Sequence, residues 1–168
     1  RAEITADDLV FIMGAGPVGL SILKMAKLRG ATCFISDIVE KRLEFAKTQG
    51  ADAILNVRNM DVKEEILKLT EGLGATVVID SVCNVKSFEQ ALTYVCSAGR
   101  VITLGFSSEP SAINQFSITA REIDVRGSRL HNNKFPVVIN YFKTGKLDVT
   151  NWITHRYHFT EIREALRI

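Results

Sequence analysis

Short apolar segments alternate with amphipathic segments along most of the chain. The segments LVFIM (Leu9–Met13) and TVVID (Thr76–Asp80) are apolar at almost every position, as expected of strands that helices cover on both faces. This alternation predicts parallel strands joined by crossover helices, and therefore an α/β fold with a doubly wound, six-stranded parallel sheet. The predicted strands are Asp8–Met13, Thr32–Ser36, Ala53–Leu55, Thr76–Asp80, Arg100–Leu104 and Ile123–Arg126, and the predicted helices are Pro17–Arg29, Val39–Thr48, Asp61–Thr70, Val85–Val95 and Phe135–Thr144. The buried stripe of the first helix is expected to consist of Val18, Ile22, Met25 and Leu28.

The alternation changes after Gly145. The segment WITHRYHF, residues 152–159, predicts one more strand, and Thr160 is the expected N-cap of a following helix. We therefore predict one domain over residues 1–152 and a C-terminal segment over residues 153–168 that leads back toward a domain outside this chain.

Composition and charge narrow the class of protein. A length of 168 residues suits one domain of this kind. The 21 Lys and Arg nearly balance the 19 Asp and Glu, so the net charge of +2 gives no indication of a nucleic-acid or acidic membrane partner. No apolar run is long enough to cross a membrane, and we expect no signal peptide. Because the chain begins with Arg1 rather than methionine, we expect it to be part of a longer protein.

The three cysteines indicate a reducing compartment. Cys33, Cys83 and Cys96 are odd in number, lie in apolar surroundings and form no CxxC pair. This pattern is typical of reduced, buried thiols rather than of a disulfide framework. The expected location is cytoplasmic.

A glycine signature lies between the first predicted strand and the first predicted helix. The spacing is Gly14-x-Gly16-x-x-Gly19, and each glycine has its own function in a dinucleotide site. Gly14 permits a tight turn, Gly16 lets a pyrophosphate approach the backbone, and Gly19 lets the helix pack closely on the sheet. Pro17 suits the first helical turn, where its missing N–H removes no intrahelical bond. The free N–H groups and the helix dipole would face the phosphates.

An aspartate ends the second predicted strand, at the spacing expected of an acid that binds the adenosine ribose. Asp37 also discriminates between cofactors, because a 2′-phosphate at about 4 Å would be repelled by roughly 4 kcal/mol at an effective dielectric near 20. That repulsion corresponds to more than about a hundredfold preference for NAD over NADP, unless Lys41 or Arg42 compensates. Arg42 is better suited to stack on the adenine. We predict NAD.

Five segments in order carry a family resemblance. They read LVFIMGAGPVGL, DIVEKRLEFAKTQGADAILN, VVIDSVCN, AGRVITLGF and ITHRYHFTEIREAL. Together they resemble the cofactor-binding half of the zinc-dependent medium-chain alcohol and polyol dehydrogenases, and within that family the bacterial sorbitol, threonine, and idonate or galactonate dehydrogenase branch. The resemblance covers essentially the whole chain and implies a six-stranded Rossmann sheet.

The resemblance also implies roles for particular residues. Gly16, Pro17 and Val18 would meet the pyrophosphate, and Asp37 and Arg42 would hold the adenosine. The remaining implied cofactor contacts are Ser81 and Val82 as a wall, Leu104 and Gly105 near the nicotinamide, and Arg129 as a phosphate contact. Val82 and Leu104 could equally be core residues, and Arg129 could equally be a solvated loop charge.

The resemblance places the chemistry outside this chain. The family's zinc ligands belong to the other half of the protein, so we expect zinc only in the full-length parent and no catalytic or metal-binding residue here. His155 and His158 lie three apart in an expected strand, so their side chains would point to opposite faces. The parent would transfer hydride between a secondary alcohol (a polyol or sugar acid) and NAD, whereas the isolated chain would bind the cofactor without turnover.

Other functions remain open at this point. A nucleotide-sensing module could keep the same site without catalysis. An S-adenosylmethionine-dependent methyltransferase would usually carry its third glycine where Val18 stands, and a zinc-free quinone reductase would more often favour NADP, which Asp37 disfavours. The strand near Ile123–Gly127 is expected at an edge of the sheet, where relatives join two subunits, so a homodimer through this strand is predicted.

Overall fold

The computed structural model describes residues 1–167, which form two compact units. The larger unit comprises Arg1–Leu130, and the smaller unit begins at His131. The sequence-based domain boundary after residue 152 concerns the whole protein and stays a prediction.

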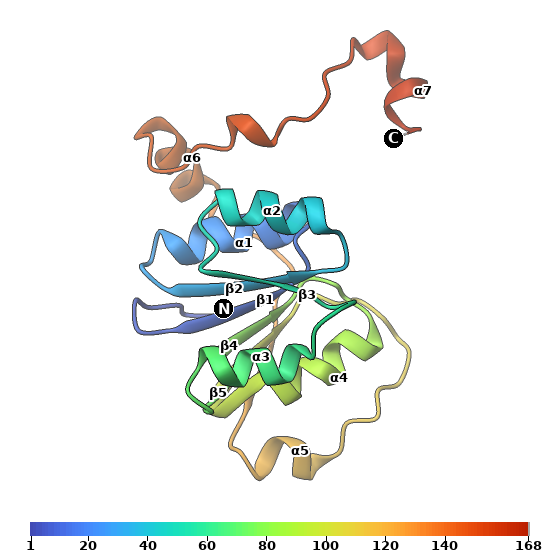
Figure 1. Ribbon diagram of the computed structural model, residues 1–168. Helices are drawn as coiled ribbons and strands as arrows, with labels where there is room; N and C mark the ends of the chain where they lie inside the picture. The colour runs from blue at the N-terminus through green and yellow to red at the C-terminus, as the bar shows by residue number, and fades with distance from the viewer. Residues whose placement is uncertain (168) are drawn as a thin grey trace. The chain divides into compact units, whose positions relative to one another are not determined.

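The larger unit contains a six-stranded, all-parallel sheet in the order β3-β2-β1-β4-β5-β6 (Figure 1). This confirms the predicted α/β fold and the position of the last strand at an edge. The strands are β1 (Leu9–Met13), β2 (Thr32–Asp37), β3 (Ala53–Asn56), β4 (Ala75–Asp80), β5 (Val95–Thr103) and β6 (Asp124–Gly127). The helices of this unit are α1 (Pro17–Lys27), α2 (Glu40–Thr48), α3 (Val62–Leu69), α4 (Val85–Tyr94) and α5 (Gln115–Thr119).

Helices cover both faces of the sheet. α1 and α2 lie on one face, and α3 and α4 lie on the other (Figure 1). The strand order reverses between β1 and β4, and at such a point the connections leave in opposite directions and open a crevice at the carboxyl ends of the strands. The fold therefore places any ligand site beside the ends of β1 and β4.

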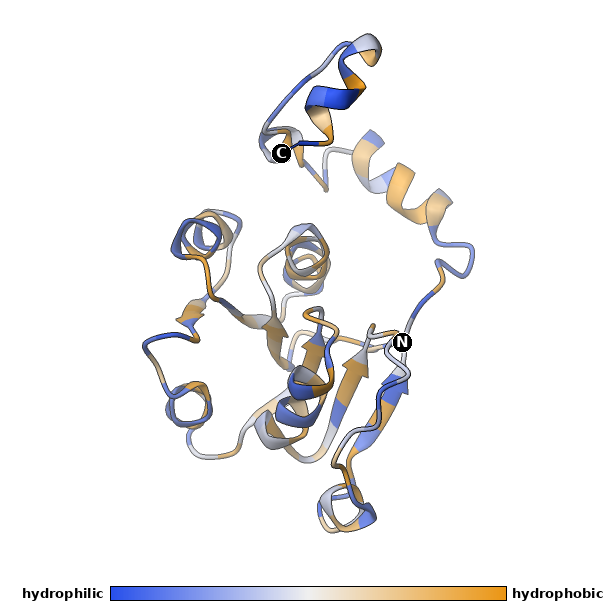
Figure 2. Ribbon diagram, turned by 90° about the vertical axis from the view of Figure 1, so that its right-hand side faces the viewer, coloured by the Kyte–Doolittle hydropathy of each residue, from blue (hydrophilic) through white to orange (hydrophobic). Residues whose placement is uncertain are grey.

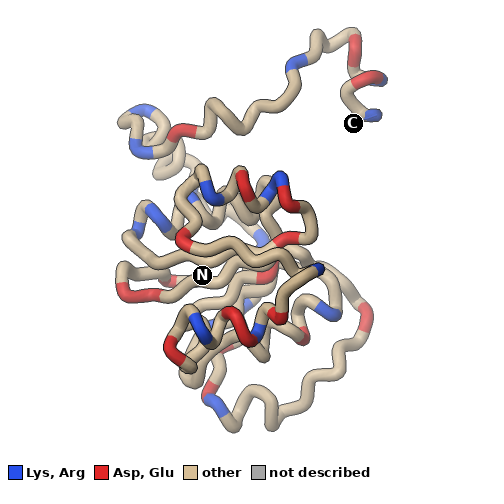
Figure 3. The backbone as a smooth tube through the Cα atoms, in the orientation of Figure 1, with Lys and Arg blue, Asp and Glu red and all other residues tan. Residues whose placement is uncertain are grey.

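The central strands form the core. Val10, Phe11 and Ile12 of β1 are fully buried, as are Val77 and Val78 of β4. The central strands are accordingly largely orange in Figure 2, whereas charges of both signs alternate along the outer helices α2 and α3 (Figure 3). Burial on both faces confirms the prediction made from LVFIM and TVVID.

The predicted buried stripe of α1 was wrong. Val18 is 52% exposed and Leu28 is 40% exposed, and Ile22 and Met25 are only partly buried. α1 packs closely against the turn after β1, where a Cβ at Gly19 would meet the Gly14 carbonyl, and a neighbouring stripe faces the sheet. The residues of α1 that are buried are Gly19, Leu20, Leu23 and Ala26.

A cluster of hydrogen-bonded polar side chains connects the amino ends of the strands to one another. The Asp8 carboxylate accepts hydrogen bonds from the Thr5 N–H (2.8 Å), the Thr76 hydroxyl (2.7 Å) and the Arg100 guanidinium. Burial disfavours the charged carboxylate, yet these donors outweigh burial and hold the pKa of Asp8 below its ordinary value. Asp8 lies before β1 and Arg100 lies within β5, so the cluster links strands that are distant in sequence.

The smaller unit contains α6 (Phe135–Lys143), close to its predicted position, followed by short 3₁₀ helices at Thr150–Trp152 and Phe159–Glu161 and by α7 (Ile162–Ala165). The predicted strand over residues 152–159 was wrong, because a strand needs a neighbour to bond its backbone and this segment pairs with none of the six strands. The predicted N-cap was also wrong: Glu161, not Thr160, precedes α7.

Candidate functional site

The turn between β1 and α1 has a tightly constrained first glycine. Gly14 follows β1 with φ +94°, a conformation that side chains rarely adopt, and its N–H donates to the Ser36 carbonyl at 2.8 Å. A Cβ at Gly14 would lie only 3.0 Å from the Ser81 hydroxyl oxygen. The Ser81 hydroxyl in turn donates to the Met13 carbonyl at 2.6 Å, which ties the end of β4 to the turn.

The other two glycines differ in what surrounds them. A Cβ at Gly19 would lie 1.8 Å from the Gly14 carbonyl oxygen, so only glycine permits this packing of α1. A Cβ at Gly16 would meet no atom within 4 Å, and the backbone there has an ordinary φ of −74°. Neither packing nor conformation of the folded chain therefore requires glycine at position 16. The open space beside Gly16 leaves room for a ligand.

The start of α1 presents donors to this space. The first bond of the helix runs from the Leu20 N–H to the Gly16 carbonyl, at 2.9 Å. Within residues 1–167, the N–H groups of Gly16, Val18 and Gly19 have no hydrogen-bond partner, and Pro17 has no N–H. Together with the partial positive charge of an 11-residue helix, these groups can bind an anion such as a pyrophosphate.

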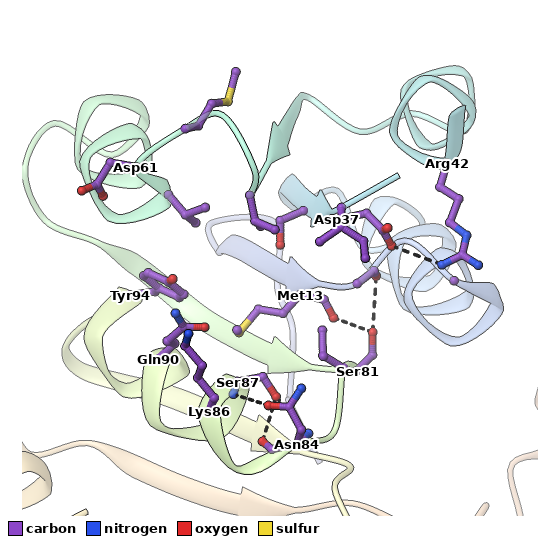
Figure 4. A pocket seen from close by; sticks show the side chains of 18 residues that line it. Met13, Asp37, Arg42, Asp61, Ser81, Asn84, Lys86, Ser87, Gln90 and Tyr94 are labelled. Carbon is purple, nitrogen blue, oxygen red and sulfur yellow. Dashed lines mark hydrogen bonds and ion pairs between the residues drawn. The ribbon is translucent and has the colours of Figure 1, made fainter. Parts of the chain in front are cut away.

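Asp37 faces the glycine turn from the end of β2. One of its carboxylate oxygens accepts a hydrogen bond from the Ala15 N–H at 2.8 Å, and the other accepts one from the Val39 N–H at 2.9 Å. The side chain is only 7% exposed, and the Arg42 guanidinium lies 3.8 Å away (Figure 4). The carboxylate is thus fixed beside the turn and has one cation at its edge.

A cavity of about 650 Å³ is lined by half of the predicted cofactor contacts. It lies at the carboxyl ends of β1, β2 and β4, and Lys86, Gln90 and Tyr94 of α4 close its far side (Figure 4). The predicted site residues that line it are Gly14, Gly16, Asp37, Arg42, Ser81 and Val82. Its size and mixed lining are suited to an adenosine.

A second, mainly apolar cavity of about 310 Å³ contains two more predicted contacts. Val18 and Leu104 line it together with Ile79, Ile102 and Ser128. The exposure of Val18, which contradicts its expected role in the buried stripe, is therefore compatible with its other predicted role as a cofactor contact.

Gly105 and Arg129 lie at the ends of β5 and β6, outside these two cavities. Gly105 lines a smaller cavity of about 290 Å³ with Thr103 and Cys83. The Arg129 guanidinium carbon lies 3.9 Å from the centre of the Phe106 ring.

Sequence reasoning missed Asp80, the residue that positions the wall of the large cavity. Asp80 is fully buried, and one carboxylate oxygen accepts hydrogen bonds from the N–H groups of Val82 (3.0 Å) and Cys83 (3.1 Å). The other oxygen accepts a hydrogen bond from the Ser87 hydroxyl at 2.9 Å, and Asn84 forms a capping box with Ser87 at the start of α4 (Figure 4). The spacing of Asn84 and Ser87 before an amphipathic run is a capping signal that could have been recognised.

Metal-binding groups are not assembled in the part of the chain that the structure describes. Within residues 1–167, no three His, Cys, Asp or Glu side chains are grouped to hold a metal ion. Cys33, Cys83 and Cys96 are free thiols, and burial raises the pKa of Cys33 to about 12. The described residues therefore do not fit a zinc site.

Comparison with known proteins identifies the family. The pattern of the zinc-binding dehydrogenase family matches residues 17–144. The chain belongs to this family. Membership contradicts the methyltransferase alternative, and so does the parallel pairing of β6 with β5 in place of a reversed hairpin.

Curated relatives that align with nearly the whole chain include proteins from Escherichia coli, Vitis vinifera and Bacillus subtilis. The starvation-sensing protein RspB of Escherichia coli is 34% identical over 100% of this chain and 50% of its own length. L-idonate 5-dehydrogenase of Vitis vinifera is 32% identical over 96% of this chain and 45% of its own length. Sorbitol dehydrogenase of Bacillus subtilis is 32% identical over 99% of this chain and 48% of its own length. The chain thus spans about half the length of the curated relatives that it matches.

Solved structures that share its fold include two that contain a nicotinamide cofactor. An alcohol dehydrogenase from Escherichia coli CFT073, complexed with NADH, superposes with a TM-score of 0.92 at 34% identity, over 99% of this chain and 49% of that chain. A zinc-binding dehydrogenase from Sinorhizobium meliloti bound to NADP gives a TM-score of 0.93 at 26% identity, over 99% of this chain and 50% of that chain. Over residues 1–167, the chain has no helix that is both long and apolar enough to span a membrane.

Proposed function

We propose that this chain is the NAD-binding domain of a zinc-type dehydrogenase that transfers hydride between a secondary alcohol and NAD. The observation that carries the proposal is the space beside Gly16, which is bordered by unpartnered N–H groups of α1 and by the fixed carboxylate of Asp37. An extended dinucleotide requires this combination of an anion site and a ribose acceptor.

Each half of the cofactor has a place in the proposed arrangement. The pyrophosphate lies against the backbone of Gly16, Pro17 and Val18. The adenosine enters the large cavity, where Asp37 accepts hydrogen bonds from the ribose hydroxyls and Arg42 lies against the adenine. Ser81 and Val82 form the wall.

The nicotinamide half lies against Val18 and Leu104 in the apolar cavity, with the backbone of Gly105 beside it. When bound, the nicotinamide supplies the hydride acceptor. The protein supplies position and excludes water: the apolar walls fix one face of the ring, while the turn after β1 fixes the phosphates. Zinc belongs to residues of the full-length protein outside this chain, and no step of the chemistry is assigned to it here.

The substrate of the full-length protein is a small polyol or sugar acid. L-idonate and sorbitol dehydrogenases among the relatives support this class. In the full-length protein, residues 1–152 form the cofactor domain and residues 153–168 lead back to the catalytic domain. Free thiols at all three cysteines support a cytoplasmic location.

Calorimetry with the 168-residue chain tests the proposed function. We expect NADH to bind with one site per chain and NADPH to bind more than a hundredfold more weakly, because of Asp37. Incubation with NAD, zinc and sorbitol should produce no NADH. A folded chain without saturable NADH binding would contradict the proposal, and so would zinc-dependent turnover by this chain alone. The nucleotide-sensing alternative predicts the same binding. Polyol oxidation by the full-length protein distinguishes the two functions, because a nucleotide sensor would not catalyse it.

We also propose that the protein is a homodimer through β6. β6 is an edge strand, and its residues Asp124, Val125 and Gly127 are exposed, so an equivalent strand of a second copy could pair with it. Replacing Val125, which is 37% exposed, by proline should convert the dimer to a monomer, because proline cannot donate a backbone hydrogen bond. Light scattering measures the mass directly. A Val125→Thr control should remain dimeric, and a dimeric proline variant would contradict this interface.

A further inference from the structure

The Arg129 guanidinium lies over an aromatic ring. Its guanidinium carbon lies 3.9 Å from the centre of the Phe106 ring, and Phe106 itself is 73% exposed. A guanidinium over a ring face is attracted by the ring without using its N–H groups as hydrogen-bond donors. Within residues 1–167, Arg129 forms no ion pair or hydrogen bond, whereas Arg126 pairs with Glu3 and Asp124. The N–H groups of Arg129 are therefore available to bind an anion.

The backbone of β5 and β6 determines where this pair stands. The Ser128 N–H donates to the Thr103 carbonyl at 2.9 Å, which extends the pairing of the two strands to the residue before Arg129. Ser128 also lines the apolar cavity, as does Leu104, which stands two residues before Phe106 in the chain. The stacked pair therefore flanks the cavity in which the nicotinamide ring is proposed to bind.

The cofactor's own phosphates lie too far away to be the anion. In the strand order, β6 is three positions from β1, and neighbouring strands are about 4.8 Å apart, so the two strand ends are separated by roughly 14 Å. The proposed pyrophosphate site follows β1. An arginine that is stacked on Phe106 cannot also extend across β4 and β5 to reach it.

We propose that Phe106 and Arg129 bind an anionic group, a carboxylate or phosphate, on the substrate, so that the full-length protein acts on an acidic polyol in preference to a neutral one. This inference rests on the proposed function, because it requires the nicotinamide to lie against Val18 and Leu104. A guanidinium binds such groups through two parallel hydrogen bonds, which adds geometric selectivity to charge. The occurrence of an L-idonate dehydrogenase among the relatives supports this substrate class.

Steady-state kinetics of the full-length protein test the proposal. The substrates are four- to six-carbon alditols, the matching aldonates and the matching alditol phosphates, with saturating NAD. We expect an acidic substrate to give a kcat/KM at least about tenfold above its neutral counterpart. Arg129→Gln should lower kcat/KM for the acidic substrate by about 10- to 100-fold, chiefly through KM, and leave the neutral one within about twofold.

Three further variants sharpen this test. Arg129→Lys should restore only part of the preference, because it keeps the charge and loses the paired hydrogen bonds. Phe106→Leu should lower the preference for the acidic substrate by about threefold to tenfold, because the guanidinium loses its contact with the aromatic ring. Arg29→Gln is the matched control. This exposed arginine follows the end of α1 and lies outside the site, so its replacement should leave all these kinetic constants unchanged.

Binding of NADH to the 168-residue chain separates the two possible sources of the anion. Arg129→Gln should leave the NADH dissociation constant within about twofold of the unmodified chain. Equal losses for acidic and neutral substrates, together with weaker NADH binding, would assign Arg129 to the cofactor and overturn the proposal. A neutral best substrate, or no turnover of any member of the panel, would also overturn it. Failure of the unmodified chain to bind NADH would contradict the proposed function itself.

Discussion

Replacing Gly16 by valine is expected to weaken NADH binding at least about a hundredfold while the fold stays intact. A side chain at this position enters the open space beside the start of α1 and keeps a pyrophosphate from the unpartnered N–H groups, each of which would otherwise form a charge-assisted hydrogen bond. The backbone at Gly16 already has a conformation that valine adopts. The free energy of unfolding should therefore change by no more than about 1 kcal/mol. Calorimetry and urea denaturation measure the two quantities.

The Gly19→Ala variant, in contrast to Gly16→Val, is expected to lose stability. Its Cβ would lie 1.8 Å from the Gly14 carbonyl oxygen, so α1 must move away from the sheet. We expect a loss of about 3 kcal/mol in unfolding free energy, the upper end of the usual cost of overpacking. A Gly16→Val chain that unfolds like Gly19→Ala, or that binds NADH normally, would contradict the distinct roles assigned to the two glycines.

Replacing Asp37 by asparagine is expected to remove most of the preference for NADH over NADPH. The carboxylate would repel a 2′-phosphate by roughly 4 kcal/mol at about 4 Å, and asparagine removes that charge while keeping nearly the same shape. NADPH should therefore bind at least about tenfold more tightly to the variant. NADH should bind about tenfold more weakly, because the ribose loses a charged acceptor. Competition between the two cofactors, followed by fluorescence, gives the ratio.

Arg42 determines how much NADPH binding the Asp37→Asn chain can gain. Its guanidinium lies 3.8 Å from the Asp37 carboxylate and would face an introduced 2′-phosphate. Adding Arg42→Gln to the Asp37→Asn chain should remove most of the gain in NADPH binding. If Asp37→Asn leaves the preference for NADH above a hundredfold, the repulsion assigned to Asp37 is not what selects the cofactor.

Much of the fold could be predicted because local patterns and tertiary packing agree there. β1 and β4 are covered on both faces, and their apolar runs reflect this. β5 shows the opposite case: it begins at Val95, five residues before the predicted Arg100, because α4 ends at Tyr94 and passes directly into the strand. The small residues of this segment resemble a loop, and only the pairing of Val95 with Ala75, across an irregularity in register, makes the segment a strand.

The candidate site was predictable where one short segment carries the chemistry. Glycine spacing and an acid at the end of β2 are both visible in the sequence. The bond from Ser81 to the Met13 carbonyl is not visible, because it joins strands that are neighbours only in the folded sheet. The stacking of Arg129 on Phe106 is hidden for the same reason, since it depends on the pairing of β5 with β6.

The binding site of the pyrophosphate is tested most directly by amide NMR. Spectra of the 168-residue chain are recorded during a titration with NADH. If the phosphates bind at the opening of α1, the largest and saturable shifts will belong to the amides of Gly16, Val18 and Gly19, and ADP will reproduce them. Saturable binding that leaves these three amides unmoved, with the largest shifts elsewhere in the chain, would show that the cofactor lies in a different place.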